Sequence, residues 1–81
     1  MATARRTSDH GEIRKWAEKR EGHPAIAGTG VLRIDFGEPE ERLRQIDWKE
    51  FFAIFDRSNV DFLYDPDGHF NKFVDKDRDA E

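Results

Sequence analysis

The residues of this chain best suited to bind a metal are three histidines, His10, His23 and His69. They are widely separated, and their spacing matches no common zinc site, in which ligands come in closely spaced pairs. In the hairpins expected below, His23 and His69 fall at opposite ends. We therefore expect solvated imidazoles and no metal centre.

An acidic loop, "DPDGHFN", begins like a calcium-binding loop at Asp65, Asp67 and Gly68. The twelfth position of such a loop requires a glutamate that binds through both oxygens, and this chain has Lys76 there. A type I turn explains Pro66 and Gly68 without an ion. The sequence therefore predicts neither a metal nor a cofactor.

Nucleophiles for catalysis are scarce. The chain has no cysteine, and its serines and threonines lie outside any nucleophile-elbow pattern. The "GTG" of residues 28–30 follows an expected strand but precedes no helix, so no helix N-terminus would face a phosphate there. Because a domain of this length has little room for a concave pocket, we expect a protein that is not an enzyme.

Length and composition limit the class of protein. The 81 residues suffice for one domain, and although 40% of them are charged, the 12% that are aromatic are clustered, which indicates folding. The absence of cysteine and of a long apolar run predicts a cytoplasmic location without membrane contact.

Two segments have the pattern of amphipathic helices that begin at an aspartate. Asp9 and Asp47 are each followed three residues later by a glutamate, as in a capping box, and then by an apolar residue. The first helix is expected to end at "EGHP", where Gly22 suits the left-handed conformation. The second is expected from about Trp48 to Arg57.

The two caps are 38 residues apart, and the same offset relates the segments that follow the helices. Apolar patterning predicts strands at 24–27 and 31–36 and again at 60–64 and 69–74. The predicted fold class is α+β in the order α-β-β-α-β-β, with one four-stranded antiparallel sheet, two helices on one face and an internal pseudo-two-fold repeat. The offset fails in the last strand, where either a bulge restores the register or Phe73 points away from the helices.

The predicted domain occupies residues 8–75. It is flanked by a flexible N-terminal arm at 1–7 and a flexible charged tail at 76–81. Between the halves, "GEPEERLRQ" is a polar connector in which Pro39 is expected to begin one helical turn that ends at Leu43.

The segment "QIDWKEFFAIF", residues 45–55, is rich in aromatic side chains. On a helix these side chains cover about a third of the circumference, the width that a helix buries against a small sheet, so we expect core. A carbohydrate-binding role would instead require Trp16 or Trp48 to be exposed. The residues expected to be mostly buried are Trp16, Phe36, Phe51, Phe55, Phe62 and Phe70.

The surface best suited to a partner is the sheet face that the helices leave open. It would carry Arg33, Leu63 and Phe73, the last two forming an apolar patch on neighbouring strands. Ala25, Val31 and Asp35 are expected on the same face. We therefore expect a protein-binding or self-associating module, with a protein partner or a second copy of the chain on that face. Scattered apolar residues on an open sheet also occur without any partner.

Nucleic acid is the alternative partner. The basic side chains Arg5, Arg6, Arg14, Lys15 and Arg20 would form a basic face on the arm and first helix. However, the net charge of the whole chain is −4, and glutamates interspersed among these basic residues favour pairing on a solvated face. This hypothesis is therefore less favoured.

Several motifs occur in a fixed order between Thr7 and Val74: "TSDHGEIRKWAEKREGHPA", "GTG", "LRIDF", "IDWKEFFAIFD" and "FNKFV". In this order they resemble a family of short stand-alone bacterial proteins of unknown function, some of which are labelled as glucan branching enzymes. The resemblance implies no such activity here, because glycosyl transfer needs a carbohydrate cleft with an acid and a nucleophile, normally on a large barrel. It implies no catalytic residues.

Overall fold

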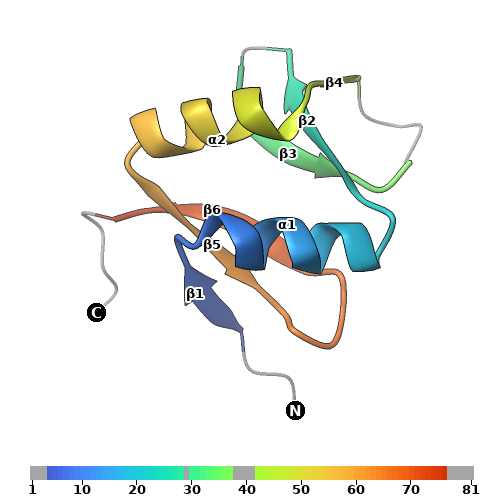
Figure 1. Ribbon diagram of the computed structural model, residues 1–81, viewed down its shortest axis with the longest axis vertical. Helices are drawn as coiled ribbons and strands as arrows, with labels where there is room; N and C mark the ends of the chain where they lie inside the picture. The colour runs from blue at the N-terminus through green and yellow to red at the C-terminus, as the bar shows by residue number, and fades with distance from the viewer. Residues whose placement is uncertain (1–3, 29, 38–41, 77–81) are drawn as a thin grey trace.

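The computed structural model describes residues 4–28, 30–37 and 42–76, which form two helices and six strands. In chain order the elements are β1 (Arg5–Thr7), α1 (His10–Lys19), β2 (His23–Ala27), β3 (Leu32–Asp35), β4 (Leu43–Gln45), α2 (Trp48–Arg57), β5 (Val60–Tyr64) and β6 (Asn71–Asp75) (Figure 1). The α+β class predicted from the sequence is confirmed.

Both helices begin at the predicted aspartates. The Asp9 carboxylate accepts a hydrogen bond of 3.2 Å from the backbone N–H of Glu12, and the Asp47 carboxylate accepts one of 2.8 Å from Glu50. Each cap satisfies a donor that the first helical turn leaves without an intrahelical partner. Neither helix in the described part of the chain is long and apolar enough to span a membrane.

The end of α1 differs from the prediction that Gly22 adopts the left-handed conformation. Glu21 does so, with φ of 59°. The N–H groups of Glu21 and Gly22 donate to Glu18 O at 3.1 Å and to Ala17 O at 2.8 Å, which is a Schellman motif. Glycine is needed at position 22 for another reason, since a Cβ there would lie 2.7 Å from Ile34 Cγ2.

The strands form two three-stranded antiparallel sheets, so the prediction of a single four-stranded sheet is wrong. Sheet A has the order β1-β5-β6 and sheet B the order β3-β2-β4. The two predicted hairpins, β2–β3 and β5–β6, are present. Within the described residues no ladder joins the hairpins to each other; each is extended instead by a short strand from elsewhere in the chain.

These two added strands lie where the sequence predicted none. Arg5–Thr7, in the predicted flexible arm, pairs with β5. Leu43–Gln45, where the predicted helical turn was to end, pairs with β2. The remainder of that predicted turn, residues 38–41, lies outside the described residues. Three-residue strands of mainly polar side chains carry too little apolar alternation to be recognised.

The pairing of β5 with β6 continues one residue beyond β6, to Lys76. Lys76 donates its backbone N–H to Asn59 O at 3.1 Å, which extends the contact between β5 and β6 by one residue. Residues 77–81, the remainder of the predicted tail, lie outside the described residues.

The order strand–helix–strand–strand occurs in each half of the chain. The first strand of each half pairs with the other half: β1 with β5, and β4 with β2. The two sheets are thus assembled in the same way. The internal pseudo-two-fold repeat itself stays a prediction, because a shared order of elements does not establish equivalence of the residues.

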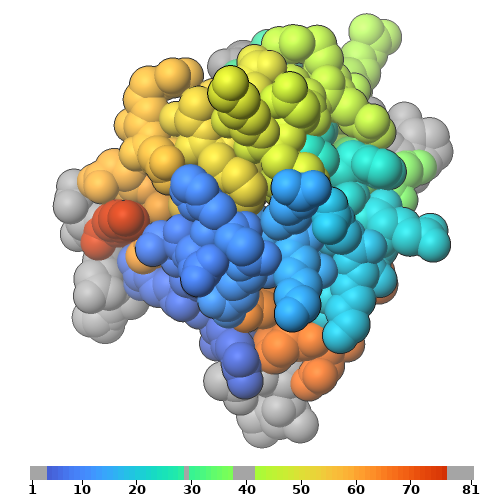
Figure 2. Space-filling view, in the orientation of Figure 1, coloured from blue at the N-terminus to red at the C-terminus, as the bar shows by residue number. Residues whose placement is uncertain are grey.

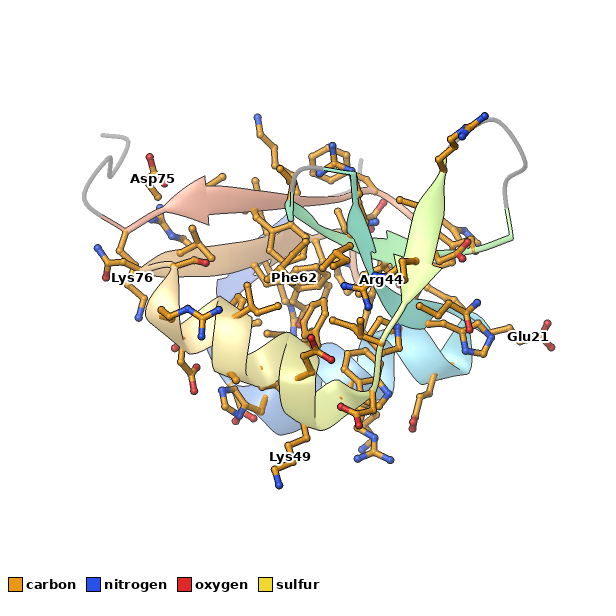
Figure 3. All side chains as sticks on the ribbon, turned by 90° about the horizontal axis from the view of Figure 1, so that it is seen from above. Glu21, Arg44, Lys49, Phe62, Asp75 and Lys76 are labelled. Carbon is orange, nitrogen blue, oxygen red and sulfur yellow. The ribbon has the colours of Figure 1, made fainter. Side chains whose placement is uncertain are left out.

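A single hydrophobic core lies between the helices and both sheets. Helix α1 passes in front of β5 and β6 in Figure 1, the two helices cover the centre of that face in Figure 2, and Phe62 lies in the middle of the molecule in Figure 3. The buried residues of this core are Ile13, Trp16, Ala17, Leu32, Ile34, Phe51, Phe55, Phe62 and Tyr64. Four of the aromatic residues predicted to be buried are among them, and Phe36 is partly buried against them.

Phe70 is the exception, because it is 51% exposed. The first hairpin closes with a hydrogen bond of 2.8 Å from Ala27 N–H to Val31 O, and the second with one of 3.0 Å from Asp65 N–H to Phe70 O. The second loop is therefore one residue longer than the first. The 38-residue offset ends there, which places Phe70 opposite Asp65 at the end of the hairpin, on the face of Lys72 and not on the core face of β6.

Candidate partner-binding site

The three residues predicted to bind a partner do not share one sheet face. Phe73 stands opposite Phe62 across β5 and β6 and packs against the core. Leu63 stands opposite Lys72 and therefore lies on the other face of sheet A, because side chains alternate along a strand. The predicted placement of Phe73 beside Leu63 is wrong. The longer loop restores the register of β6 without a bulge.

The outer face of sheet A is charged around Leu63. The cross-strand neighbours of Leu63 are Arg6 on β1 and Lys72 on β6. Arg6 Nε lies 2.9 Å from an Asp61 carboxylate oxygen, and Lys76 Nζ lies 3.9 Å from the other. The predicted pair of Leu63 and Phe73 is therefore absent from this face, and Val74, which stands opposite Asp61, is an apolar residue that shares it with Leu63.

The outer face of sheet B carries polar side chains on either side of Ala25. Ala25 is fully buried yet lies outside the core cluster, and its cross-strand neighbours are Arg33 and Gln45. The Gln45 amide donates to Asp35 at 3.3 Å. Because Ala25 is fully buried, the prediction that it is available on an open face is wrong.

The remaining feature of the strands is the boundary between the two sheets. β3 is an edge of sheet B and β6 is an edge of sheet A, and in Figure 1 β3 lies above β6. The two strands line the same two hollows, which places them side by side. They lack the close Cα packing found between the paired strands, so their separation exceeds the roughly 4.8 Å of one strand spacing.

The first hollow, of about 320 Å³, opens on the helix side of this boundary. Its lining residues are Gly30, Val31, Leu32, Ser58, Val60 and Phe73. Val31 is 46% exposed there, one of two large apolar side chains in the described residues with such exposure. We call this space the apolar hollow.

The second hollow, of about 270 Å³, opens on the outer face of the boundary. Val31, Arg33, Asn71, Lys72 and Phe73 line it, and its two charged residues are both cationic. We call it the cationic hollow. Two predicted site residues, Arg33 and Phe73, thus come together here, whereas Leu63 does not line this space.

Backbone groups of β3 point at this boundary. Val31 O accepts from Ala27 N–H at 2.8 Å, so Val31 belongs to a hydrogen-bonded pair of the β2–β3 ladder. Bonding to the neighbouring strand alternates along an antiparallel ladder. Leu32 and Ile34 therefore direct their N–H and C=O groups away from β2, toward β6.

The same alternation applies to β6. Lys76 N–H donates to Asn59 O at 3.1 Å, which fixes the hydrogen-bonded pairs of the β5–β6 register. Asn71 and Phe73 lie between those pairs, so their backbone groups point away from β5, toward β3. The boundary is consequently lined by backbone donors and acceptors from both sides. Sequence reasoning missed this because it placed both hairpins in one sheet.

Elsewhere, a partly buried polar cluster joins β1, α1 and β5. The Tyr64 hydroxyl donates to one oxygen of Glu12, and the Thr7 hydroxyl donates to the other at 2.9 Å. Burial raises the pKa of Tyr64, and the adjacent Glu12 carboxylate raises it further. The Glu12 side chain therefore holds β1 and β5 to α1 and does not return to the Asp9 amide as a capping box predicts.

The basic residues of the nucleic-acid alternative are dispersed. Arg6 pairs with Asp61 as described above, and Arg14 Nε lies 3.0 Å from Glu18. Arg20 donates to the carbonyls of Trp16, Pro66 and Gly68 and stacks on the Trp16 ring, 4.5 Å from its centroid. Three of the five side chains predicted to contact nucleic acid thus interact with other groups of the protein.

The remaining two are Arg5 and Lys15. Arg5 stands opposite Tyr64 across β1 and β5 and interacts with its hydroxyl, which lowers the pKa of Tyr64 against the larger effects that raise it. Lys15 borders a small hollow of about 170 Å³ beside Trp16. Trp16 is 5% exposed, which removes one of the two rings required for carbohydrate binding. Trp48, the other, is partly buried against the core.

Among residues 4–28, 30–37 and 42–76, no group of three metal-ligating side chains converges. His10 is stacked on Phe52 with ring centroids 4.1 Å apart, and its Nε2 lies 2.7 Å from Asp56. His69 packs edge-on against Phe36. Two of the three histidines are thus in contact with aromatic rings.

Comparison of the chain with protein-family models, curated proteins and solved structures gave no match. The resemblance to short bacterial proteins stays an expectation, and the proposals below are based on the geometry of the molecule.

Proposed function

We propose that this protein is a small non-enzymatic interaction module that binds an extended segment of a partner protein at the boundary between β3 and β6. The observation that carries the proposal is the pair of edge strands facing each other across two hollows. The backbone groups of Ile34, Asn71 and Phe73 and the N–H of Leu32 face that space, whereas the Leu32 carbonyl accepts a hydrogen bond of 3.1 Å from Arg33 Nη1. An extended peptide forms hydrogen bonds with such groups by strand addition.

The surroundings of this boundary support a specific contact. Exposed strand edges are aggregation hazards that proteins normally blunt with charge, and Arg33 and Lys72 lie beside these edges. Val31 nevertheless leaves an apolar side chain 46% exposed in the middle. An apolar centre with a charged rim is the composition of a protein-binding surface.

The first experiment is a selection of random linear peptides displayed against the purified full chain. We expect enriched peptides to shift the amide resonances of Leu32, Ile34, Asn71 and Phe73 and to slow their hydrogen exchange, because strand addition occupies these groups. Enriched peptides that affect only other amides, or no enrichment at all, would contradict the proposal.

A second copy of the chain is the competing occupant. Light scattering across a range of concentrations, with exchange of the same amides followed at each, tests it. If the chain dimerises and these amides become protected without any peptide, the boundary is a homodimer interface and the partner proposal is wrong. Binding of duplex or single-stranded nucleic acid in a low-salt gel shift, without peptide binding, would favour the alternative of the basic N-terminal residues.

A further inference from the structure

The apolar hollow lies on the helix side of the β3–β6 boundary, and its walls continue the hydrophobic core. Leu32 belongs to the core cluster, and Val60 and Phe73 pack against that cluster. Val31 completes the wall and is 46% exposed. An apolar group that fills the hollow therefore extends the core outward by one side chain, which is the favourable contribution that burial provides.

Three hydrogen-bond donors of this lining already have acceptors. Gly30 N–H donates to Ala27 O at 2.7 Å, and the N–H and hydroxyl of Ser58 donate to Ile54 O at 2.9 and 2.7 Å. The described residues of the lining also include no charged side chain. A polar group placed there would lose its hydration without gaining a bond from these donors, so the hollow suits an apolar side chain.

The hollow has room for one large side chain. Its volume of about 320 Å³ is at the lower end of the range that small-molecule sites occupy. A branched aliphatic or aromatic side chain would contact valine, leucine and phenylalanine walls there. We call a side chain bound in this way the anchor.

The segments of the chain outside the described residues do not supply an anchor. Residues 29, 38–41 and 77–81 read "T", "EPEE" and "DRDAE", and none of them is large and apolar. Met1 precedes β1, which forms the edge of sheet A remote from the boundary. The anchor therefore comes from another molecule.

The helix side of the boundary is open beside Leu32 and closed beside Ile34. These two are successive core-side residues of β3, since side chains alternate along a strand. Ile34 is 6% exposed, belongs to the core cluster and lines neither hollow. A bound strand therefore has room for a large side chain beside Leu32 but not beside Ile34, two residues away.

We infer that the segment recognised at the β3–β6 boundary carries one large apolar anchor and, two positions from it on one side, a glycine, alanine or serine. The anchor enters the apolar hollow beside Leu32, and the small residue stands beside Ile34. The small residue precedes the anchor in a strand antiparallel to β3 and follows it in a parallel strand. This inference rests on the proposed function and specifies its partner.

The test uses capped synthetic peptides with a central Ala–Thr–Phe–Thr–Ala segment in a threonine-rich background. In three variants serine replaces the phenylalanine, leucine replaces the first alanine, or leucine replaces the second alanine. Affinity for the full chain is measured by fluorescence polarisation. We expect the serine peptide to bind at least about tenfold more weakly than the parent peptide, because it loses the buried ring.

The two leucine peptides test the position beside Ile34. One of them should bind about tenfold more weakly than the parent peptide, because leucine at that position overpacks the closed part of the boundary. The other should bind as the parent does. The position that is affected gives the direction of the bound strand.

A charge placed in the wall of the hollow provides the decisive variant. Val31→Asp is expected to weaken the parent peptide about tenfold and to strengthen a peptide with lysine in place of the phenylalanine. Phe70→Asp is the matched control and should change neither affinity, because Phe70 is 51% exposed and lines neither hollow. Circular dichroism checks that each variant is folded, and an unfolded variant would not gain affinity for the lysine peptide.

The outcomes separate this inference from the proposed function. If all the peptides protect the amides of Ile34 and Phe73 with equal affinity, strand addition stands and the inference is wrong. If both leucine peptides are weakened, or neither is, the one-sided spacing is wrong. If Val31→Asp has no greater effect than Phe70→Asp, the hollow does not hold the anchor. If the parent peptide does not bind, the inference is overturned, whatever the random library selects.

Discussion

Phe62 and Phe73 face each other across β5 and β6 with ring centroids 5.3 Å apart, and Phe73 also contacts Phe51 and Phe55 of α2 at 6.1 and 6.3 Å. Aromatic pairs at these distances add to the stabilisation that comes from burial alone. This contact joins sheet A to the second helix. It also fixes the register of β6, because Phe73 would face solvent after a slip of one residue.

Replacement of the buried ring at the centre of this contact is expected to be severe. Phe62 is fully buried, so Phe62→Ala should lower the free energy of unfolding by about 3–5 kcal/mol through lost burial and the cavity left behind. Urea denaturation measures the loss. Phe70→Ala is the control, since that ring is 51% exposed, and it should change stability by no more than about 0.5 kcal/mol. Equal effects of the two changes would contradict the assignment of the core.

The local parts of the fold were predictable from the sequence. The caps at Asp9 and Asp47 depend on residues three positions apart, and a helix with one apolar face is recognisable from its period alone. The aromatic residues of α2 were correctly assigned to the core for the same reason. Each hairpin was also recognisable, because its two strands are adjacent in the sequence.

The arrangement of the hairpins was not predictable in the same way. Nothing local specifies whether β3 pairs with β6, and the strands that occupy the other edges, β1 and β4, are short and mainly polar. The error at Phe70 came from one additional loop residue, which a fixed offset cannot register. The candidate site depends on both features, so the sequence placed Arg33, Leu63 and Phe73 on one sheet face, whereas Phe73 lies on the core side of sheet A and Leu63 on its outer face.

Removal of a helix cap should lower the stability of the protein by less than removal of a core ring. Asp47→Ala removes the acceptor of the 2.8 Å bond from Glu50 N–H and should destabilise the protein by about 1 kcal/mol. Lys49→Ala, an exposed change in the same helix, is the control and should lie within about 0.5 kcal/mol of the parent. Thermal denaturation by circular dichroism distinguishes them. An unchanged transition in Asp47→Ala would show that the cap contributes nothing.

The variant Gly22→Ala tests the close contact between the end of α1 and β3. A Cβ at this position would lie 2.7 Å from Ile34 Cγ2 and 2.9 Å from Phe36 Cε1, so Gly22→Ala should cost about 1–3 kcal/mol through overpacking. At Gly28 an added Cβ meets nothing within 4 Å, so Gly28→Ala should be nearly neutral. Chemical denaturation of both variants gives the comparison. Similar stabilities would mean that the contact relaxes without cost.

The variant Arg20→Lys tests the connection between α1 and the β5–β6 turn. The Arg20 guanidinium donates to the carbonyls of Trp16 and Pro66, each at 2.8 Å, and to that of Gly68, and it lies over the Trp16 ring. Lysine keeps the charge but lacks the planar set of donors, so Arg20→Lys should cost about 1–3 kcal/mol. Arg14→Lys replaces an exposed arginine with one intrahelical ion pair and serves as the control, with an expected change below about 0.5 kcal/mol. If Arg14→Lys lowers the free energy of unfolding as much as Arg20→Lys does, the hydrogen bonds of Arg20 to the β5–β6 turn add no stability beyond that of an exposed arginine.

Tyr64 links stability to alkaline pH. Burial raises its pKa above the usual value of 10.0, and the Glu12 carboxylate that accepts its hydroxyl proton raises it further. Below about pH 10 the hydroxyl is protonated in both the folded and the unfolded chain, so its contribution is fully present. Above that pH the unfolded chain loses the proton first, and the free energy of unfolding should fall until the pH exceeds the raised pKa.

The chain offers a direct measurement of this effect because Tyr64 is its single tyrosine. The ultraviolet absorbance of tyrosinate, followed against pH, should give a midpoint above 10 in the folded protein and near 10 in urea. Tyr64→Phe should remove this part of the decline in stability above about pH 10, and it should cost about 1 kcal/mol at neutral pH through the lost hydrogen bond to Glu12. A folded-state midpoint at or below the value in urea would mean that the Glu12–Tyr64 contact does not hold β5 to α1 in solution.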